Sequence, residues 1–366
     1  MAIASTLPPA LEKLLNVARW APSGDNAQPW TFRIDSEDRI TLHIHCAAGN
    51  VYEYADGQPT LISAGTLLEN IEIAAPAFGR KASWRYQGCS NGVHAIEISL
   101  QQSDTGGTSP LFDEIGRRSV DRRPFRTRAL SKDQKSALAA EVSRDISLCW
   151  FESLADRRKV AGLTRLATEI RLRIPETFEI HNRIVDWDNL KSEHGIPARA
   201  LGLDPLTLKI MRWTLARRAR TEISNRLGSP TFAALQMDIL PGIFSAAYFA
   251  FVIEKRAPDP AARAIQLLKV GQSVQRFWLR ATKLGLAMQP CLAPLAFAHY
   301  GRTGENFTSH ASSLRAAARL ALRMDQALCR PGEPVFLGRI GWPRTSLESR
   351  SVRRPLMELM EPGPRL

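Results

Sequence analysis

Ala21-Pro22-Ser23-Gly24-Asp25-Asn26-Ala27-Gln28-Pro29-Trp30 is the stretch from which the fold can be worked out. Before it, apolar residues recur at helical spacing, and after it they alternate as in a strand. The stretch is therefore predicted to be a corner between a helix and a strand. Pro22 ends the helix, Gly24 lets the backbone approach a ligand closely, and polar side chains project from a rigid frame at Ser23, Asn26 and Gln28. A simple polar turn is the alternative.

Composition limits the class of protein. The chain has 366 residues, of which 44% are hydrophobic and 23% are charged, as is typical of a soluble globular protein with room for two domains. No apolar run reaches the roughly 18 residues that span a bilayer, and the first seven residues do not predict a signal peptide. The five scattered cysteines form no Cys-x-x-Cys, so we expect no metal site and a cytoplasmic location. The net charge of +13 indicates either an anionic partner or a solvated basic surface.

Two long apolar helices organise the rest of the chain. One is predicted over 61–78, where Gly65 lies among small residues that allow close packing, and the other over 261–284, with Gly271 in a similar place. Each is flanked by predicted strands and followed by a glycine that caps it. This weak internal repeat predicts an α+β fold of two related halves, 1–108 and 109–366, with a linker over 101–108.

A cluster of arginines opens the second half, in the stretch Arg117-Arg118-Ser119-Val120-Asp121-Arg122-Arg123. Guanidinium groups bind phosphate oxygens in a bidentate manner, and a serine hydroxyl adds a further donor. The cluster therefore predicts an anion site, with an exposed basic loop as the alternative.

Both stretches resemble motifs of the nitroreductase family. The corner is similar to that family's Ala-Pro-Ser-x-x-Asn-x-Gln-Pro-Trp, which contacts FMN, and Arg117 and Ser119 match its Arg-x-Ser-x-Arg/Lys phosphate motif. Asp121 stands where the third basic residue is usual, so that residue is Arg122 or Arg123. The resemblance implies that FMN is bound by Pro22, Ser23, Gly24, Asn26, Gln28, Arg117, Arg118, Ser119 and Arg122, together with a C-terminal basic pair for which Arg353 and Arg354 are the candidates.

The order of these motifs also carries information. In the family the phosphate motif precedes the corner, and the two motifs of one site come from different subunits of a dimer. Here the phosphate motif follows the corner, and each occurs once. The chain thus resembles the tandem, Acg-type branch: two nitroreductase-like halves fused as an interlocked pseudo-dimer with one FMN site. The first half is incomplete, and a lid is expected over about 196–242. Such a chain would work as a monomer, with further dimerisation left open.

The resemblance implies an FMN-dependent oxidoreductase that passes hydride from NADH or NADPH to a nitroaromatic, quinone or similar small acceptor. No hydrolytic motif, P-loop or Gly-x-Gly-x-x-Gly competes, and no catalytic side chain is nominated. An FMN-binding protein with a closed lid and little turnover is the alternative. We expect no membrane partner and no nucleic acid, although a basic helix predicted over 206–225 offers a weaker nucleic-acid hypothesis.

Overall fold

The computed structural model describes residues 7–47, 49–103, 107–327 and 332–361. Residues 1–6, which bear on the expected lack of a signal peptide, and residues 104–106 of the expected linker lie outside the described residues.

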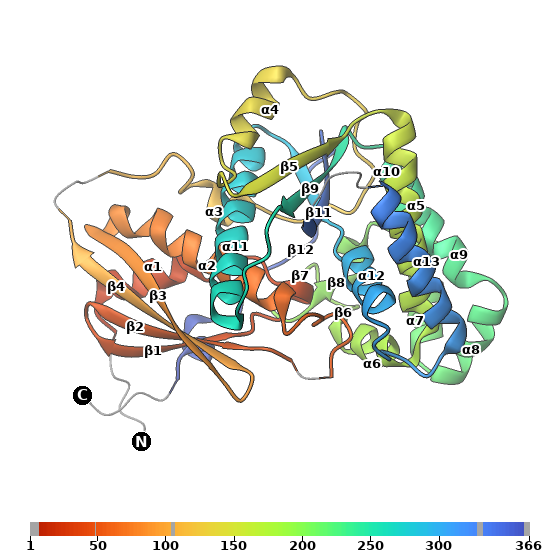
Figure 1. Cartoon of the computed structure of the whole chain (residues 1–366), viewed down its shortest axis with the longest axis horizontal. Helices are drawn as coiled ribbons and strands as arrows, with labels where there is room; N and C mark the ends of the chain where they lie inside the picture. The colour runs from red at the N-terminus through yellow and green to blue at the C-terminus, as the bar shows by residue number, and fades with distance from the viewer. Residues whose placement is uncertain (1–6, 48, 104–106, 328–331, 362–366) are drawn as a thin grey trace.

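The first half is an antiparallel sheet with two helices on it (Figure 1). The sheet has the order β1-β2-β4-β3, and the half consists of α1 (Pro9–Ala18), β1 (Trp30–Ser36), β2 (Arg39–His45), α2 (Gln58–Ala74), β3 (Arg80–Ser90) and β4 (Val93–Gln102). Alternate residues of β1 and β2, such as Phe32 and Leu42, are fully buried because one face of the sheet packs on the helices. The predicted corner and strand pairs are thus confirmed. Strand β4 continues two residues into the expected linker.

The second half contains another antiparallel sheet and most of the helices. Its sheet has the order β10-β11-β9-β5, from β5 (Ile146–Phe151), β9 (Ala247–Ile253), β10 (Ala287–Pro290) and β11 (Glu333–Gly341). The helices are α3 (Glu114–Arg117), α4 (Lys132–Ala139), α5 (Leu154–Arg173), α6 (Pro175–Ile184), α7 (Pro205–Leu215), α8 (Arg218–Arg226), α9 (Ser229–Ala234), α10 (Leu240–Ile243), α11 (Pro260–Lys283), α12 (Ala293–Thr303) and α13 (Ala311–Ala327). Every residue of β9 is buried, because helices cover one of its faces and α11 the other.

The two predicted central helices, α2 and α11, pack directly on each other. A Cβ atom added to Gly65 would lie 2.0 Å from the Leu268 carbonyl oxygen, and one added to Gly271 would lie 2.0 Å from the Ile62 carbonyl oxygen. The helices can approach this closely only because both positions are glycine. One hydrophobic core therefore runs through both halves, which makes the chain an α+β protein of two joined halves.

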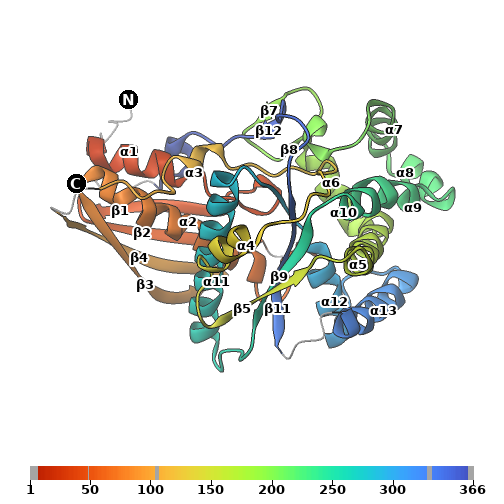
Figure 2. The ribbon, with the colours of Figure 1, turned by 90° about the horizontal axis from the view of Figure 1, so that it is seen from above.

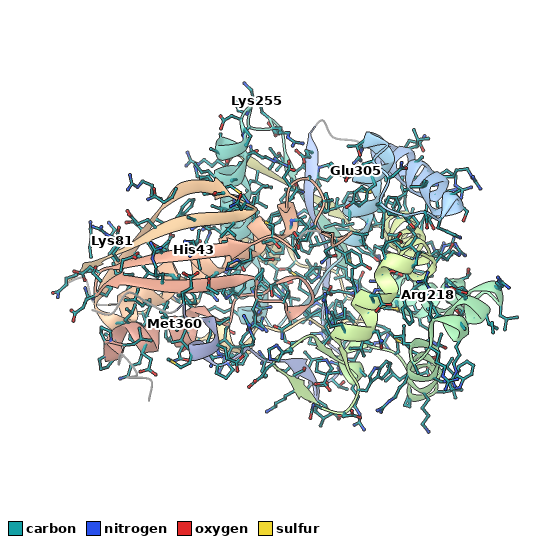
Figure 3. The ribbon with its side chains drawn as sticks, turned by 90° about the horizontal axis from the view of Figure 1, so that it is seen from below. His43, Lys81, Arg218, Lys255, Glu305 and Met360 are labelled. Atoms are coloured by element: carbon teal, nitrogen blue, oxygen red, sulfur yellow. The ribbon has the colours of Figure 1, made fainter. Side chains whose placement is uncertain are left out.

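The C-terminal segment ties the second half back to the first. Strand β12 (Arg350–Ser351) pairs with β7 (Lys191–Ser192), and the chain then runs to the outer edge of the first sheet. There Met360 bridges Phe32 of β1, and the Glu361 amide donates to the Phe32 carbonyl at 2.8 Å. Figure 3 shows Met360 beside this sheet. The halves are interlocked in this sense, while the domain boundary at 108 stays a prediction.

The basic helical stretch predicted over 206–225 is confirmed as helical, but it consists of two helices. Arg217 is extended, with φ −149° and ψ 129°, so α7 ends at Leu215 and α8 begins at Arg218. The break turns α8 back against α7, and the Arg220 guanidinium then lies 4.6 Å from the centre of the Trp213 ring. Helical spacing does not reveal such a break, because both arms keep the helical period.

Candidate functional site

The corner 21–30 is a strained turn held by its own side chains. Three residues that are not glycine have left-handed φ angles: 50° at Asp25, 57° at Asn26 and 50° at Gln28. The Ser23 hydroxyl oxygen accepts the Gln28 amide at 2.9 Å, and the Gln28 side chain donates to the Asn26 carbonyl at 3.0 Å. Left-handed residues of this kind cost about 1–3 kcal/mol each and concentrate at functional sites.

A hollow lies in front of this corner and encloses, with its open mouth, about 490 Å³. Four segments that are far apart in the sequence form its wall. They contribute Pro22, Ser23, Asp25, Asn26, Arg118, Ser119, Val120, Arg122, Ile196, Ala200, Arg350, Ser351 and Arg353. The corner and the arginine cluster therefore meet at one place, as a single FMN site formed by both halves requires.

The hollow carries an excess of positive charge. Four arginines line it, against a single carboxylate, that of Asp25. None of the four forms an ion pair with a residue that the structure describes, whereas the neighbouring Arg117 and Arg123 pair with Glu114 and Asp121. The Nε atoms of Arg118 and Arg350 are buried and have no hydrogen-bond partner in the part of the chain that the structure describes. An anion is the ligand that such a wall would stabilise most.

The pKa values of these arginines reflect the free-energy cost of holding several cations close together and out of water. Burial lowers the pKa of Arg118 well below its usual range, and Arg353 and Arg350 lower it further. Burial likewise lowers the pKa of Arg353 to about 9, with Arg350 and Arg19 adding to the shift. Since arginine keeps its proton in proteins, these shifts indicate that like charges are held together out of water.

Asp25 is the one acidic residue among those that line the hollow. Burial raises the pKa of its carboxyl, and Arg122, Arg171 and Arg183 oppose that shift. Burial lowers the pKa of Arg122 to about 10; Asp25 opposes this shift, and Arg171 and Arg339 strengthen it. Asp25 thus offsets part of the positive charge of the wall, chiefly that of Arg122.

Backbone carbonyls hold the arginine side chains in place. Arg118 donates to the Trp20 carbonyl at 3.0 Å, and its guanidinium lies 4.5 Å from the centre of the Trp278 ring on α11. Arg122 donates to the Ala200 carbonyl at 3.2 Å. The cations are therefore preorganised by neutral partners, so their charge is left for a ligand.

Several of the predicted residues are not in the wall. Arg117 has a side chain 72% exposed, and Arg118 occupies the hollow in its place. Of the two candidates for the third basic residue, Arg122 lines the hollow, while Arg123 is held by Asp121. Gly24 is exposed, does not have a left-handed φ angle and is not among the residues that line the hollow, so the close approach of a ligand there stays a prediction.

Gln28 and Arg354 do not line the hollow, but they hydrogen-bond to the segments that do. The Arg354 amide donates to the Gln28 side-chain oxygen at 2.9 Å, and the buried Gln28 also donates to the Glu193 carbonyl at 2.9 Å. Of the C-terminal basic pair, only Arg353 reaches the hollow.

Asn26 lines the hollow, but both polar atoms of its side-chain amide already form hydrogen bonds within the protein. It donates to the carbonyls of Glu193 and Val352 at 3.0 Å, and its oxygen accepts Arg353 at 2.8 Å. Asn26 therefore clamps the C-terminal segment to the corner.

Sequence reasoning missed Arg350 and Ser351, although a signal was present. Two segments have the same amino-acid sequence apart from the additional Asp121 in the first. They are Arg118-Ser119-Val120-Asp121-Arg122-Arg123-Pro124 and Arg350-Ser351-Val352-Arg353-Arg354-Pro355. Each copy places an Arg-Ser pair and the next arginine in the wall. In each copy the last arginine turns away and fixes backbone elsewhere.

The described part of the chain holds no group of three or more His, Cys, Asp or Glu side chains placed to bind a metal. No protein-family model matches the chain.

Two curated relatives match most of the sequence. They are "Putative NAD(P)H nitroreductase MT3217" and "Putative NAD(P)H nitroreductase Rv3131", both of Mycobacterium tuberculosis. Each is 26% identical over 302 residues, which cover 78% of this chain and 76% of the relative. The chain is thus a relative of proteins named as nitroreductases, which confirms the resemblance seen in the two motifs. Its place in the tandem branch stays a prediction.

Solved nitroreductase structures give a weaker match. The FMN-dependent nitroreductase NfnB from Mycobacterium smegmatis, in complex with NADPH, is 15% identical with a TM-score of 0.35, over 67% of this chain and 94% of that one. The NADPH:FMN oxidoreductase from Vibrio harveyi, complexed with NAD+, is 12% identical with a TM-score of 0.34, over 67% of this chain and 73% of that one. Similarity at this level does not define a shared fold.

Proposed function

We propose that the chain is an FMN-dependent oxidoreductase that takes hydride from NADH or NADPH and reduces a nitroaromatic, a quinone or a similar small acceptor. One observation carries the proposal: the nitroreductase-like corner faces a hollow lined by four arginines that form no ion pair with any described residue. The two relatives, both named as NAD(P)H nitroreductases, support the reaction class.

The residues present fit FMN. Its phosphate matches the excess charge, and the unpartnered Nε atoms of Arg118 and Arg350 provide donors for it. Arg118, Ser119, Arg122, Arg350 and Arg353 would hold the phosphate, while Pro22 and Ser23 would contact the rest of the cofactor. The bound flavin would supply the hydride-accepting and hydride-donating group.

This chain's own residues then have the tasks of binding and orienting. The Ser23 hydroxyl oxygen already accepts the Gln28 amide, so its proton is free to donate to a ligand. Asn26 and Gln28 keep the corner and the C-terminal segment in register, which fixes the distance between the two ends of the hollow. No side chain is proposed as an acid or base. Because one chain supplies both sides of the hollow, we propose the monomer as the working unit, in the cytoplasm.

A titration with FMN, followed by flavin fluorescence, tests the proposal. We expect about one FMN per chain. Arg118→Ala should weaken binding about ten- to a hundredfold, since a hydrogen bond to a charged group contributes about 1.5–3 kcal/mol. Arg117→Ala is the matched control: it removes the same charge one residue away, outside the hollow, and should change the affinity less than about twofold.

The outcome that contradicts the proposal is equally clear. No saturable binding, or equal losses in the two variants, would show that the hollow is not the flavin site. If Arg118→Ala does not fold, Arg122→Ala provides the same comparison, because its guanidinium has one hydrogen bond among the described residues, to the Ala200 carbonyl.

The FMN-sequestering alternative has one observation in its favour. Ile196 and Ala200 belong to the segment 196–242, expected to be a lid, and both line the hollow. NAD(P)H oxidation by the FMN-loaded protein, with a quinone or nitroaromatic added, separates the two functions. Turnover supports the oxidoreductase, whereas tight FMN binding without turnover supports sequestration.

A further inference from the structure

The helices α7, α8 and α9 expose an unusual amount of apolar surface. Seven of the thirteen large hydrophobic side chains that are exposed among the described residues lie between positions 206 and 235. The exposed fractions include 67% for Leu206, 56% for Trp213 and 84% for Leu227. A gathering of this kind within thirty residues marks an interaction surface rather than the ordinary scatter of single apolar residues.

The apolar residues form stripes along consecutive helices. On α7 they are Leu206, Ile210 and Trp213, spaced four and three residues apart; on α8 there is Ile223, and Leu227 directly follows that helix. The Arg220 guanidinium covers the Trp213 ring at 4.6 Å, which joins the two stripes. Figures 1 and 2 show these helices at the end of the molecule farthest from the first sheet, and Figure 3 shows Arg218 on that outer end.

The same helices are strongly basic. Residues 205–227 contain six basic side chains and a single acidic one, Glu222, for a net charge of +5. Two of the arginines have an acidic neighbour, Arg212 with Asp188 at 3.1 Å and Arg218 with Glu222 at 3.3 Å, but these pairs are exposed and bind weakly. The surface therefore presents apolar side chains within a positive field.

We propose that this surface, made by α7, α8 and α9, binds the headgroup region of an anionic lipid bilayer and makes the protein peripherally membrane-associated. Exposed Leu, Ile, Trp and Phe beside Lys and Arg are what an interfacial amphipathic helix requires. A second copy of the chain would bring the same positive charge against it, and a nucleic acid would leave the aliphatic side chains without a partner. None of the described helices is long and apolar enough to cross a membrane, and the proposal needs none.

The proposal changes the sequence-based expectation of no membrane partner, and it does not rest on the flavin site. The full-length protein would be sedimented with vesicles of phosphatidylcholine alone and of phosphatidylcholine with 30% phosphatidylglycerol. We expect binding to the anionic vesicles only, with an affinity that falls as salt is raised. Replacing Arg217 and Arg218 by Gln should weaken it about twenty- to thirtyfold, since each basic residue near such a surface contributes about fivefold, or about 1 kcal/mol.

Trp213→Ala tests the apolar part in the same assay and should weaken binding about tenfold or more. The matched controls are Leu322→Ala and Arg323→Gln on α13, which also carries exposed apolar and basic residues, and they should bind as the wild type does. The proposal is overturned by no binding, by equal binding to neutral vesicles, or by α7–α8 variants that bind like the controls. It is also overturned if those variants abolish a self-association seen without lipid, or if RNA binds the surface while vesicles do not.

Discussion

Gly271→Ala should loosen the joint between the two halves and, through it, the hollow. The added Cβ would lie 2.0 Å from the Ile62 carbonyl oxygen and 2.7 Å from the Gly65 Cα, where 3.4 Å is ordinary contact. Both neighbours are backbone atoms, so no side chain can turn aside. Helices α2 and α11 must therefore separate by about 1 Å, a noticeable part of the roughly 8–10 Å between packed helix axes.

The expected cost follows from two opposing effects. Overpacking in a core destabilises by about 1–3 kcal/mol, and the upper end applies here because backbone meets backbone. Alanine in place of glycine returns about 1 kcal/mol of helix propensity. We therefore expect Gly271→Ala to lower the free energy of unfolding by about 2 kcal/mol, as measured by denaturant unfolding.

The hollow should change along with the joint. Thr66 of α2 donates to the Pro22 carbonyl at 3.2 Å, and Trp278 of α11 supports Arg118, so each helix is attached to a residue that lines the hollow. Moving them apart widens the hollow, and FMN affinity should fall by an amount that tracks the loss of stability.

Gly162→Ala is the control for this prediction. Gly162 lies inside α5, where an added Cβ meets nothing within 4 Å, so the change should stabilise by up to about 1 kcal/mol. If Gly271→Ala proves as stable as Gly162→Ala, the close approach of α2 and α11 does not exist and the reasoning is refuted.

Two further predictions concern buried polar groups. Burial raises the pKa of Glu69 from 4.5 to about 7, although Arg276 opposes the shift, so the folded state holds a proton that the unfolded state has lost. This carboxyl therefore lowers stability as pH rises from 4.5 to 7, by on the order of 3 kcal/mol, and Glu69→Gln should remove that decrease in unfolding experiments while the exposed Glu12→Gln leaves it unchanged. Asn26→Ala removes the hydrogen bonds from this side chain to Arg353 and to the Glu193 and Val352 carbonyls, and it should cost about 1–3 kcal/mol of stability. Asn189→Ala, on an exposed loop, should cost less than about 0.5 kcal/mol, and equal losses in thermal unfolding would contradict the clamp.

The sequence was sufficient to predict the central helices and the strands beside the corner. Periodicity gave both central helices and the strands beside the corner, because each of these elements buries one face against the same core. The small residues around Gly65 indicated close helix packing, and the structure confirms it with Gly271. Composition of a helix, however, does not reveal where an exposed helix breaks, and the turn at Arg217 was missed for that reason.

Motif spacing was less informative about individual side chains. Motif spacing can predict that an arginine segment reaches the hollow. Which guanidinium turns inward, however, depends on residues far away in the sequence. Arg118 turns inward because Trp278 and the Trp20 carbonyl receive it, whereas Arg117 lies on the exposed side beside Glu114. Likewise, spacing cannot show that the C-terminal segment hydrogen-bonds to both polar atoms of the Asn26 side chain.

The arginines of the hollow affect the stability of the folded protein, and this effect bears on function. Guanidinium groups gathered out of water repel one another, and the lowered pKa values of Arg118 and Arg353 both include that repulsion. Carbonyls such as that of Trp20 satisfy hydrogen bonds, yet a neutral dipole cannot cancel a net charge, and two Nε atoms are left without acceptors. Native proteins retain buried charge of one sign where a ligand or a mechanism uses it. An anion bound in the hollow would offset the repulsion in the folded state alone, so it would stabilise the fold in proportion to its affinity. The repulsion within the hollow and the proposed binding of a phosphate-bearing cofactor are thus two consequences of the same four side chains.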